Sequence, residues 1–294
     1  MVKNGENFII YLEIDKSYSN NTISTYLNNL KIFKDYIDNN NLDDYLIESV
    51  DLDKFITFLK DKYDYKPKSI NAMISSLKCY YNFLLKEKYI NNDPSYLLKS
   101  PKIDKKYPTY LTIDELNRIL LAIDTSKNLG KRDYLLINLL YDSGVRVSEL
   151  INIRINNIDF DNRLIKILGK GNKERIVYFT KKTSKLLYEY IYDICEVHKY
   201  PRKFLFENKS NVVISRFEVY NIIRKYAEKA KIEKNVTPHV LRHTIATHLI
   251  QNDADVMSVK TILGHSKVST TEIYTHLDTK DLKRKYDAIK EREK

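Results

Sequence analysis

The sequence predicts a mainly α-helical protein of two domains, with one small β-hairpin in the second domain. Its 294 residues, of which 43% are hydrophobic, can bury substantial cores, so the chain is not intrinsically disordered. Along most of the chain, apolar residues recur every three or four positions, as they do on one face of a helix. Two β-branched runs of roughly alternating polarity flank a glycine-containing turn, and this pattern is typical of a hairpin.

The first hundred residues predict a compact group of four helices. The clearest apolar stripe covers 68–87 and includes Ile70 and Leu77. Pro67 stands just before this stripe, where proline favours a helix start, and Asn91–Pro94 marks a turn after it. The predicted helices cover residues 5–14, 22–39, 50–62 and 68–87.

A stretch rich in proline and lysine separates the two predicted domains. The segment 99–108 contains two prolines and four lysines and has little apolar content, so we expect an exposed, extended linker. Thr112 and Glu115 then have the spacing of a capping box that opens a new helix. The predicted organisation is a helical domain, a linker, a second domain and a C-terminal helix, at residues 1–98, 99–110, 111–278 and 279–294.

The second domain is predicted to be mostly helical, with the hairpin near its centre. We expect strands at 163–168 and 174–179, joined by the Gly-Lys-Gly-Asn-Lys turn at 169–173. A further short strand is expected at 204–206. Helices are expected at residues 113–123, 131–142, 147–153, 182–198, 215–230, 239–251, 255–263, 269–275 and 279–292.

The positive charge of the chain is concentrated in the second domain. Lys and Arg number 50 against 39 Asp and Glu, a net charge of +11. Residues 1–106 hold 16 basic and 15 acidic side chains, a balance of 16 − 15 = +1, which leaves 34 − 24 = +10 for residues 107–294. This asymmetry favours a polyanionic partner such as DNA or RNA. A lysine-rich solvated surface is the alternative, and the charge alone does not choose between them.

Several protein classes are excluded by the sequence. No run approaches the roughly 18 apolar residues of a membrane-spanning helix, and the first residues do not have the pattern of a signal peptide. The two cysteines, Cys79 and Cys195, cannot form a disulfide framework, and no Cys/His spacing suits zinc. We therefore expect a cytoplasmic protein without a metal, a cofactor or a membrane partner.

Two motifs in the first half of the second domain could contact a phosphate. In Ser143–Leu150, a glycine ends one helix and Arg146 opens the next, which places a guanidinium group near a helix N-terminus. Lys170 lies at the tip of the predicted hairpin, from which its ammonium group could reach a DNA backbone and donate a proton. Alone, each residue is more often an ordinary surface side chain.

A second set of motifs follows towards the C-terminus. His239 and Arg242 lie one helical turn apart, after a proline that suits a helix start. His265 follows a Leu-Gly pair, and Tyr274 lies nine residues further on. A single tyrosine among 24 is usually a core or surface residue. Together with the two arginines and the lysine, however, this set suits attack of a phenol on a phosphodiester.

The order of these residues resembles the tyrosine recombinase (integrase) family, and the whole chain is similar to its Xer-type members. The resemblance implies a helical, SAM-like core-binding domain followed by a tyrosine-recombinase catalytic domain. It also implies that the enzyme cuts and rejoins DNA through a 3′-phosphotyrosine intermediate, without metal or ATP. The motifs that carry the resemblance are Ser100–Lys102, Tyr110–Thr112, Gly144–Leu150, Gly169–Arg175 and His239–Thr247.

The resemblance assigns a role to each catalytic position. Arg146 and Arg242 would bind the non-bridging phosphate oxygens, and His265 would add a hydrogen bond to the same phosphate. Tyr274 would be the nucleophile. The remaining two groups would move protons, with His239 as the base for the phenol and Lys170 as the acid for the departing 5′ oxygen.

Further residues are expected to support this chemistry. Glu149 would orient the Arg146 guanidinium or a nearby histidine, although a surface carboxylate is an equally good interpretation. Contacts to the DNA backbone that fix position without reading sequence are expected from Lys102, Lys105, Lys106, Lys173, Arg175, Lys181 and Lys182.

The resemblance also implies partners and a biological role. The expected substrate is a double-stranded recombination site, bound by a tetramer of this chain or with a paralogous recombinase, with the 279–294 helix packing into a neighbouring subunit. An FtsK-like DNA translocase is a further possible partner. The favoured role is resolution of chromosome or plasmid dimers at the nucleoid. The alternatives are a mobile-element or phage integrase, a type IB-like topoisomerase and a non-catalytic DNA-binding protein.

Overall fold

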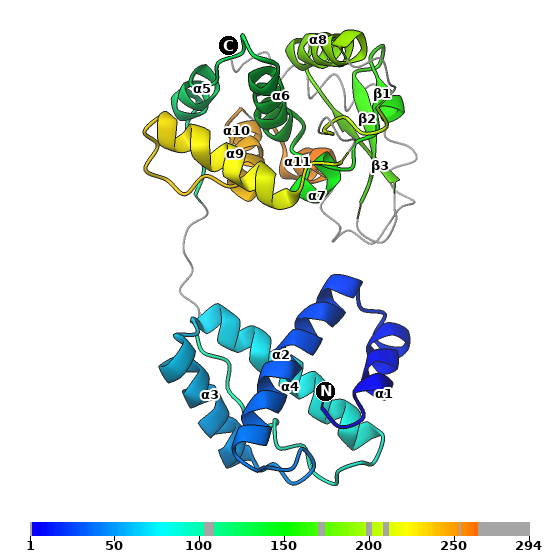
Figure 1. The fold of residues 1–294 in the computed structure, drawn as a ribbon, viewed down its shortest axis with the longest axis vertical. Coiled ribbons are helices and arrows are strands. Elements are labelled where there is room, and N and C mark those ends of the chain that lie inside the picture. Colours follow the sequence, from blue (N-terminus) through cyan, green and yellow to red (C-terminus); the bar gives the residue numbers. More distant parts are fainter. Residues whose placement is uncertain are drawn as a thin grey trace. The chain divides into compact units, whose positions relative to one another are not determined.

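The computed structural model describes residues 2–102, 109–169, 174–197, 202–207, 212–252 and 254–263. The chain divides into two compact units, Met1–Lys106 and Tyr107–Lys294, each with its own hydrophobic core. Helices dominate both units, and one small antiparallel sheet lies in the second (Figure 1). The predicted fold class is confirmed.

The N-terminal unit contains the predicted helices at nearly the predicted positions. The first begins as α1 (Gly5–Ile10) and continues as one π-helical segment over Tyr11–Asp15. The three longer helices of the N-terminal unit are α2 (Asn20–Asn39), α3 (Ser49–Tyr63) and α4 (Pro67–Lys86). Pro67 occupies the first turn of α4, where its missing N–H group costs no helical hydrogen bond. Buried aromatic rings fill the space between these helices, chiefly Phe8, Phe33, Phe55, Tyr80 and Tyr81.

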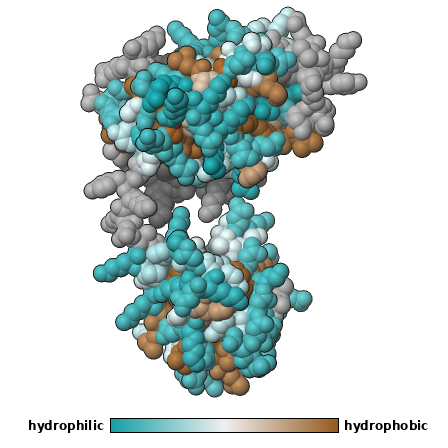
Figure 2. Space-filling view, turned by 60° about the vertical axis from the view of Figure 1, so that its left-hand side comes forward, coloured by the Kyte–Doolittle hydropathy of each residue, from teal (hydrophilic) through white to brown (hydrophobic). Residues whose placement is uncertain are grey.

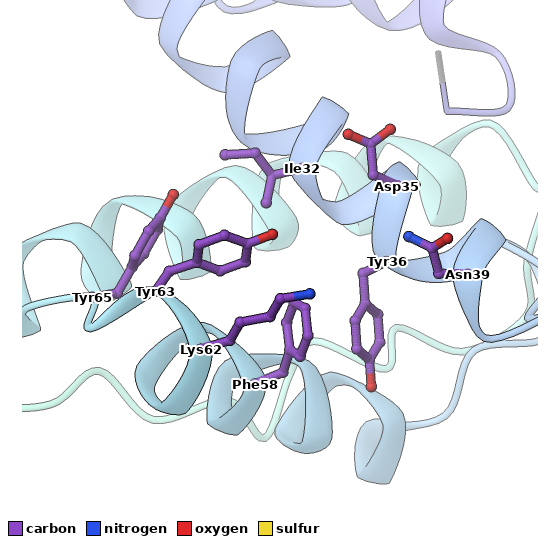
Figure 3. A pocket seen from close by; sticks show the side chains of 8 residues that line it. All are labelled: Ile32, Asp35, Tyr36, Asn39, Phe58, Lys62, Tyr63 and Tyr65. Atoms are coloured by element: carbon purple, nitrogen blue, oxygen red, sulfur yellow. The ribbon is translucent and has the colours of Figure 1, made fainter.

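A pocket of about 180 Å³ lies on the N-terminal unit, between α2 and the C-terminal end of α3 (Figure 3). Aromatic side chains form much of its wall, and the Lys62 ammonium group stands 5.2 Å from the centre of the Phe58 ring. The rings of Tyr36 and Phe58 pack with their centres 5.0 Å apart. These contacts extend the aromatic core of the unit to its surface.

The second unit is built around α6 (Asn128–Ser143), which is buried along most of its length. It packs against α8 (Lys181–Val197) and α10 (Pro238–Gln251). The other helices are α5 (Ile113–Leu121), the short α7 (Val147–Leu150), α9 (Arg216–Lys229) and α11 (Val256–Leu263). Thr112 and Glu115 form the predicted capping box at the start of α5.

The sheet contains the predicted hairpin and one strand that the sequence did not indicate. Strands β2 (Leu164–Leu168) and β3 (Glu174–Tyr178) pair antiparallel, with Ile167 opposite Arg175. A two-residue strand, β1 (Ile158–Asp159), is added on the outer side of β2. It follows a 3₁₀ turn over Ile155–Asn157 and is too short to show an alternating pattern.

Two predicted elements differ from the structure. The helix expected at 147–153 ends at Leu150, because the chain then turns towards the sheet. The strand expected at 204–206 is instead a single bridge between Arg154 and Phe204, beside a second bridge between Glu207 and Val213. The helices expected at 269–275 and 279–292 lie outside the described residues.

Hydrophilic side chains dominate the visible surface of each unit (Figure 2). In the ranges that the structure describes, every helix is too short or too polar to cross a lipid bilayer.

Candidate active site

Gly144 forms the turn that places Arg146 at the edge of the second core. It ends α6 in the left-handed conformation, with φ of +60°, which a residue without a Cβ adopts at little cost. A Cβ at this position would overlap the Leu263 side chain and lie 3.3 Å from Cγ2 of Ile245. Glycine is therefore required both by the backbone conformation and by the close packing of α10 and α11.

Arg146 is held by Glu149 through its main chain and its side chain. Its backbone N–H donates to Oε2 of Glu149 over 2.8 Å, and its Nη1 donates to Oε1 over 2.8 Å. The Arg146 side chain is 32% exposed, whereas that of Glu149 is only 4% exposed. Glu149 is thus a buried carboxylate in contact with a partly open guanidinium group, and not a solvated surface acid.

Arg175 reaches the same carboxylate from the neighbouring hairpin. Its Nη2 lies 2.8 Å from Oε2 of Glu149, and its Nε donates to Oε1 over 3.4 Å. The Arg175 side chain is 16% exposed, and its Nη1 is buried without a hydrogen-bond partner among the described residues. Arg175 was predicted to contact the DNA backbone, but its charged end lies inside the protein beside Glu149.

Arg242 connects the turn before Arg146 with the end of α11. Thr237 caps α10, and Arg242 lies one turn inside that helix with only 7% of its surface exposed. Its Nη1 donates to the carbonyl oxygen of Gly144, and its Nη2 donates to that of Leu263. A guanidinium group has five N–H donors, so three are not used by these two bonds. One side chain thereby joins three of the predicted motifs.

Arg146 and Arg175 are close enough to Arg242 to affect its ionisation. Burial lowers the pKa of Arg242 to about 10, and the positive charges of Arg146 and Arg175 add to this effect. Burial alone would raise the pKa of Glu149, but Arg175, and then Arg146, stabilise the carboxylate and lower it overall. At neutral pH, these three guanidinium groups and one carboxylate carry a net charge of +2. Such a cluster favours an anion such as a phosphate.

A buried network fixes the hairpin against the helix that leads to this cluster. Oδ2 of Asp142 accepts hydrogen bonds from the backbone N–H of Thr180 at 2.8 Å and from the Thr183 hydroxyl at 2.6 Å. Asp142 lies two residues before Gly144, and Thr180 lies five residues after Arg175. The network therefore sets the position of β3, and with it that of Arg175, relative to the Arg146 turn.

Leu111, which is fully buried in the second core, is held against α10 by two hydrogen bonds. Its backbone N–H donates to Thr244 over 3.0 Å, and its carbonyl oxygen lies 2.9 Å from Nε2 of the buried His248. Because a carbonyl only accepts, Nε2 carries a proton, and Nδ1 then accepts from the Tyr141 hydroxyl over 2.9 Å. His248 lies on the same helix as Arg242, but no motif in the sequence indicated its role.

The remaining predicted residues fall into two groups. His239 is exposed on the first turn of α10, and three of the predicted DNA contacts are exposed on the surface, namely Lys102, Lys181 and Lys182. The second group lies outside the described residues and comprises Lys105, Lys106, Lys170, Lys173, His265 and Tyr274. Within the described part of the site, the structure brings together Arg146, Glu149, Arg175 and Arg242.

Comparison with known protein families identifies the family of this chain. Residues 109–281 match the phage integrase family, and residues 6–88 match the phage integrase N-terminal SAM-like domain. The chain belongs to the phage integrase, or tyrosine recombinase, family. The recombinase is 36% identical over 285 residues to the tyrosine recombinase XerD of Staphylococcus epidermidis, with 96% of each chain covered. It is also 36% identical over 287 residues to XerD of Staphylococcus aureus, again with 96% coverage of each chain.

Solved structures of Xer recombinases have the same fold. The XerH recombinase bound to its difH substrate before cleavage is 25% identical, with a TM-score of 0.69, and 88% of this chain and 78% of that one are covered. The post-cleavage complex of XerH is 24% identical in sequence, with a TM-score of 0.70. The match covers 96% of this chain and 83% of the XerH chain. The recombinase is thus a Xer-type site-specific recombinase, an enzyme that breaks and rejoins DNA.

Replacing Gly144 with alanine should disturb both the stability and the activity of the recombinase. A non-glycine residue with left-handed φ and an added methyl group in a packed core each cost about 1–2 kcal/mol, so we expect a total loss of about 2–4 kcal/mol in unfolding free energy. Relief of the overlap would move the Arg146 turn, and a displacement of about 1 Å can lower a rate about 100-fold. Urea denaturation and single-turnover DNA cleavage measure the two effects.

Ser148→Ala is the matched control for this variant, because Ser148 is exposed on the adjacent α7. It should leave both quantities unchanged. A Gly144→Ala protein that is as stable and as active as the parent would contradict the role of this turn.

Proposed function

We propose that this recombinase resolves dimers of chromosomes or plasmids by recombination at a specific site, through a 3′-phosphotyrosine intermediate. The proposed cleavage chemistry rests on one observation, the proximity of Arg146 and Arg242. Arg242 lies there because its guanidinium group bridges the carbonyl oxygens of Gly144 and Leu263. The biological part is supported by similarity to XerD over 96% of the chain. The protein would act in the cytoplasm, on the DNA of the nucleoid.

In the proposed reaction, Tyr274 attacks the phosphorus atom of the scissile phosphodiester. The bond from the phenolic oxygen to phosphorus forms as the bond to the 5′ oxygen breaks. The phenolic proton passes to His239, and Lys170 supplies a proton to the departing oxygen. The products are a 3′-phosphotyrosine and a free 5′ hydroxyl. Attack by the 5′ hydroxyl of a second strand on the phosphotyrosine forms a new phosphodiester and releases the phenol. Each step exchanges one phosphoester bond for another, so rejoining needs no external energy source.

The arginine cluster would supply the electrostatic part of this reaction. Negative charge builds up on the non-bridging oxygens as the phenol attacks, and guanidinium groups held in advance stabilise it without having to reorganise. Arg146 is partly exposed and fixed at both ends by Glu149. Arg242 retains three N–H donors beyond its two carbonyl contacts. His265, just beyond the end of α11, would add a further hydrogen bond.

Strand exchange would take place in a larger assembly. We propose that four protomers join two DNA sites, with the 279–294 segment of each packing into its neighbour. The solved XerH structures support DNA as the partner, since XerH is bound there to its difH substrate. Lys102, Lys181 and Lys182 are exposed and suited to contact the DNA backbone. A paralogous recombinase or an FtsK-like translocase would be further partners.

The test of the proposed function is a covalent adduct on a nicked suicide duplex that carries the recombination site of the host chromosome. The parent protein should form a denaturation-resistant protein–DNA complex without metal or ATP, and Tyr274→Phe should form none. Tyr286→Phe is the control, because it removes a phenol from the same region of the chain and should leave the adduct in place.

Exchange of strands between two labelled sites then distinguishes recombination from topoisomerase activity. Absence of any adduct with the parent protein would contradict the proposed chemistry. Cleavage at attachment sites of an integrated element, and not at the chromosomal site, would contradict the proposed role in dimer resolution.

A further inference from the structure

We infer that Arg175 is a positioning residue for strand cleavage, which fixes Glu149 and through it the Arg146 guanidinium, and that it does not contact the DNA backbone. This inference rests on the phosphate-binding role proposed for Arg146. It adds a residue of the hairpin to the catalytic apparatus and assigns it a function different from that expected from the sequence.

The carboxylate of Glu149 is held on both sides. Each of its oxygens accepts one hydrogen bond from each arginine. Oε1 accepts from Nη1 of Arg146 and from Nε of Arg175. Oε2 accepts from the backbone N–H of Arg146 and from Nη2 of Arg175. A carboxylate bound in this way cannot rotate without breaking bonds to both arginines. Arg175 therefore fixes the plane of the group that orients Arg146.

The position of Arg175 on the hairpin explains why it points inward. It lies opposite the buried Ile167 and two residues before the buried Val177, so it shares the core-facing side of β3. Its Nη2 and Nε are occupied by Glu149, and its Nη1 is buried. A phosphate on the protein surface would have to displace Glu149 to reach this guanidinium group.

The charges of the site favour the same role. Without Arg175, Glu149 would keep only Arg146 as a hydrogen-bonded cation, and its buried carboxylate would lose half of the bonds that offset its desolvation. The carboxylate also attracts Arg242, whose guanidinium is repelled by both other arginines. Arg175 thus stabilises the one negative charge that allows the two proposed phosphate-binding arginines to lie close together.

The arrangement also joins the hairpin to the phosphate site. Arg175 lies five residues after Lys170, the proposed proton donor, while Arg146 lies on a separate turn after α6. The contact through Glu149 links the two described segments directly. Strand β3 is thereby held next to the arginine proposed to bind the phosphate.

The test is a double-mutant cycle between Arg175→Gln and Glu149→Gln, measured as single-turnover cleavage of the suicide duplex at saturating DNA. We expect Arg175→Gln to lower the cleavage rate about 10–100-fold, as loss of an outer partner does at other preorganised sites. The double variant should be no slower than Glu149→Gln alone, because the two residues act as a unit. Arg175→Lys, which retains one donor, should recover part of the rate.

DNA affinity and its salt dependence separate positioning from backbone contact. The dissociation constant of Arg175→Gln should stay within about twofold of the parent, and the slope of log affinity against log salt should not change. Loss of one phosphate contact would reduce that slope by about 1. Arg224→Gln is the matched control, since Arg224 forms an exposed pair with Glu228 on α9, and it should leave both rate and affinity unchanged.

Two results would overturn the inference. One is a reduced salt slope with weaker binding and a normal cleavage rate at saturation, which assigns Arg175 to the DNA backbone. The other is additivity of the two substitutions, measured with variants that circular dichroism shows to be folded at the assay temperature. Either result leaves the proposed function standing if the parent forms the Tyr274 adduct, so the two failures are distinguishable.

Discussion

Replacing Arg242 with glutamine should lower the rate of DNA strand cleavage by about 10²–10³-fold, the effect of removing a preorganised donor from a developing oxyanion. The loss has two physical sources. The transition state loses a guanidinium group, and the carbonyl oxygens of Gly144 and Leu263 lose the side chain that joins them. Single-turnover cleavage at saturating DNA measures the effect without a contribution from binding.

Arg242→Lys separates these two sources. An ammonium group keeps the positive charge but lacks the planar fork needed to bridge two carbonyls and a phosphate together. We therefore expect a loss of at least about tenfold in this variant. Arg216→Gln, on the exposed start of α9, is the control and should cleave normally. Parent-like cleavage by Arg242→Lys would show that the bridging geometry is irrelevant to the reaction.

Glu149→Gln should reduce the free energy of unfolding by about 3 kcal/mol at pH 7, because it leaves two partly buried guanidinium groups without their common anion. The pKa of this carboxyl is lowered in the folded state, despite its burial, by Arg175 and Arg146. Its stabilising contribution is therefore fully present above the pKa of an unfolded glutamate, about 4.3, and is lost as the pH falls through the folded value.

Urea denaturation of the parent and of Glu149→Gln at a series of pH values measures the loss of unfolding free energy and the direction in which it changes with pH. The difference in unfolding free energy should be constant above about pH 5.5 and should narrow below the pKa of an unfolded glutamate. Glu228→Gln, in an exposed pair on α9, should change stability by no more than about 0.5 kcal/mol. A difference that stays constant down to pH 3 would show that Glu149 is not held as a carboxylate.

The helical architecture could be predicted from the sequence because each long helix has its own apolar stripe. Ile70, Leu77 and Phe83 lie on the buried face of α4, and Pro67 begins it where expected. Strand β1 could not be predicted, since two residues are too few to show periodicity and their pairing depends on β2. The extent of α7 was overestimated because its end is set by tertiary contacts and not by a local stop signal.

The candidate site was predicted less evenly. The prediction of Arg146 and Arg242 rested on their order along the chain, which resembles the tyrosine recombinase family. The glycine and the proline near them indicated the helix ends that the structure shows there. The contact between Arg175 and Glu149 could not be predicted. A hairpin rich in lysine and arginine has the same composition whether its side chains face DNA or the protein interior. The inward direction follows from the strand register, in which Arg175 and Val177 share one side of β3. Contacts between distant segments of this kind require the fold.

The hydrogen bonds of Leu111 tie the start of the second core to the helix that carries Arg242. Both polar groups of that one backbone unit are secured to α10, by Thr244 and His248. Leu111 therefore cannot shift without breaking hydrogen bonds to α10, so this buried residue and the helix that positions Arg242 are expected to move as one body.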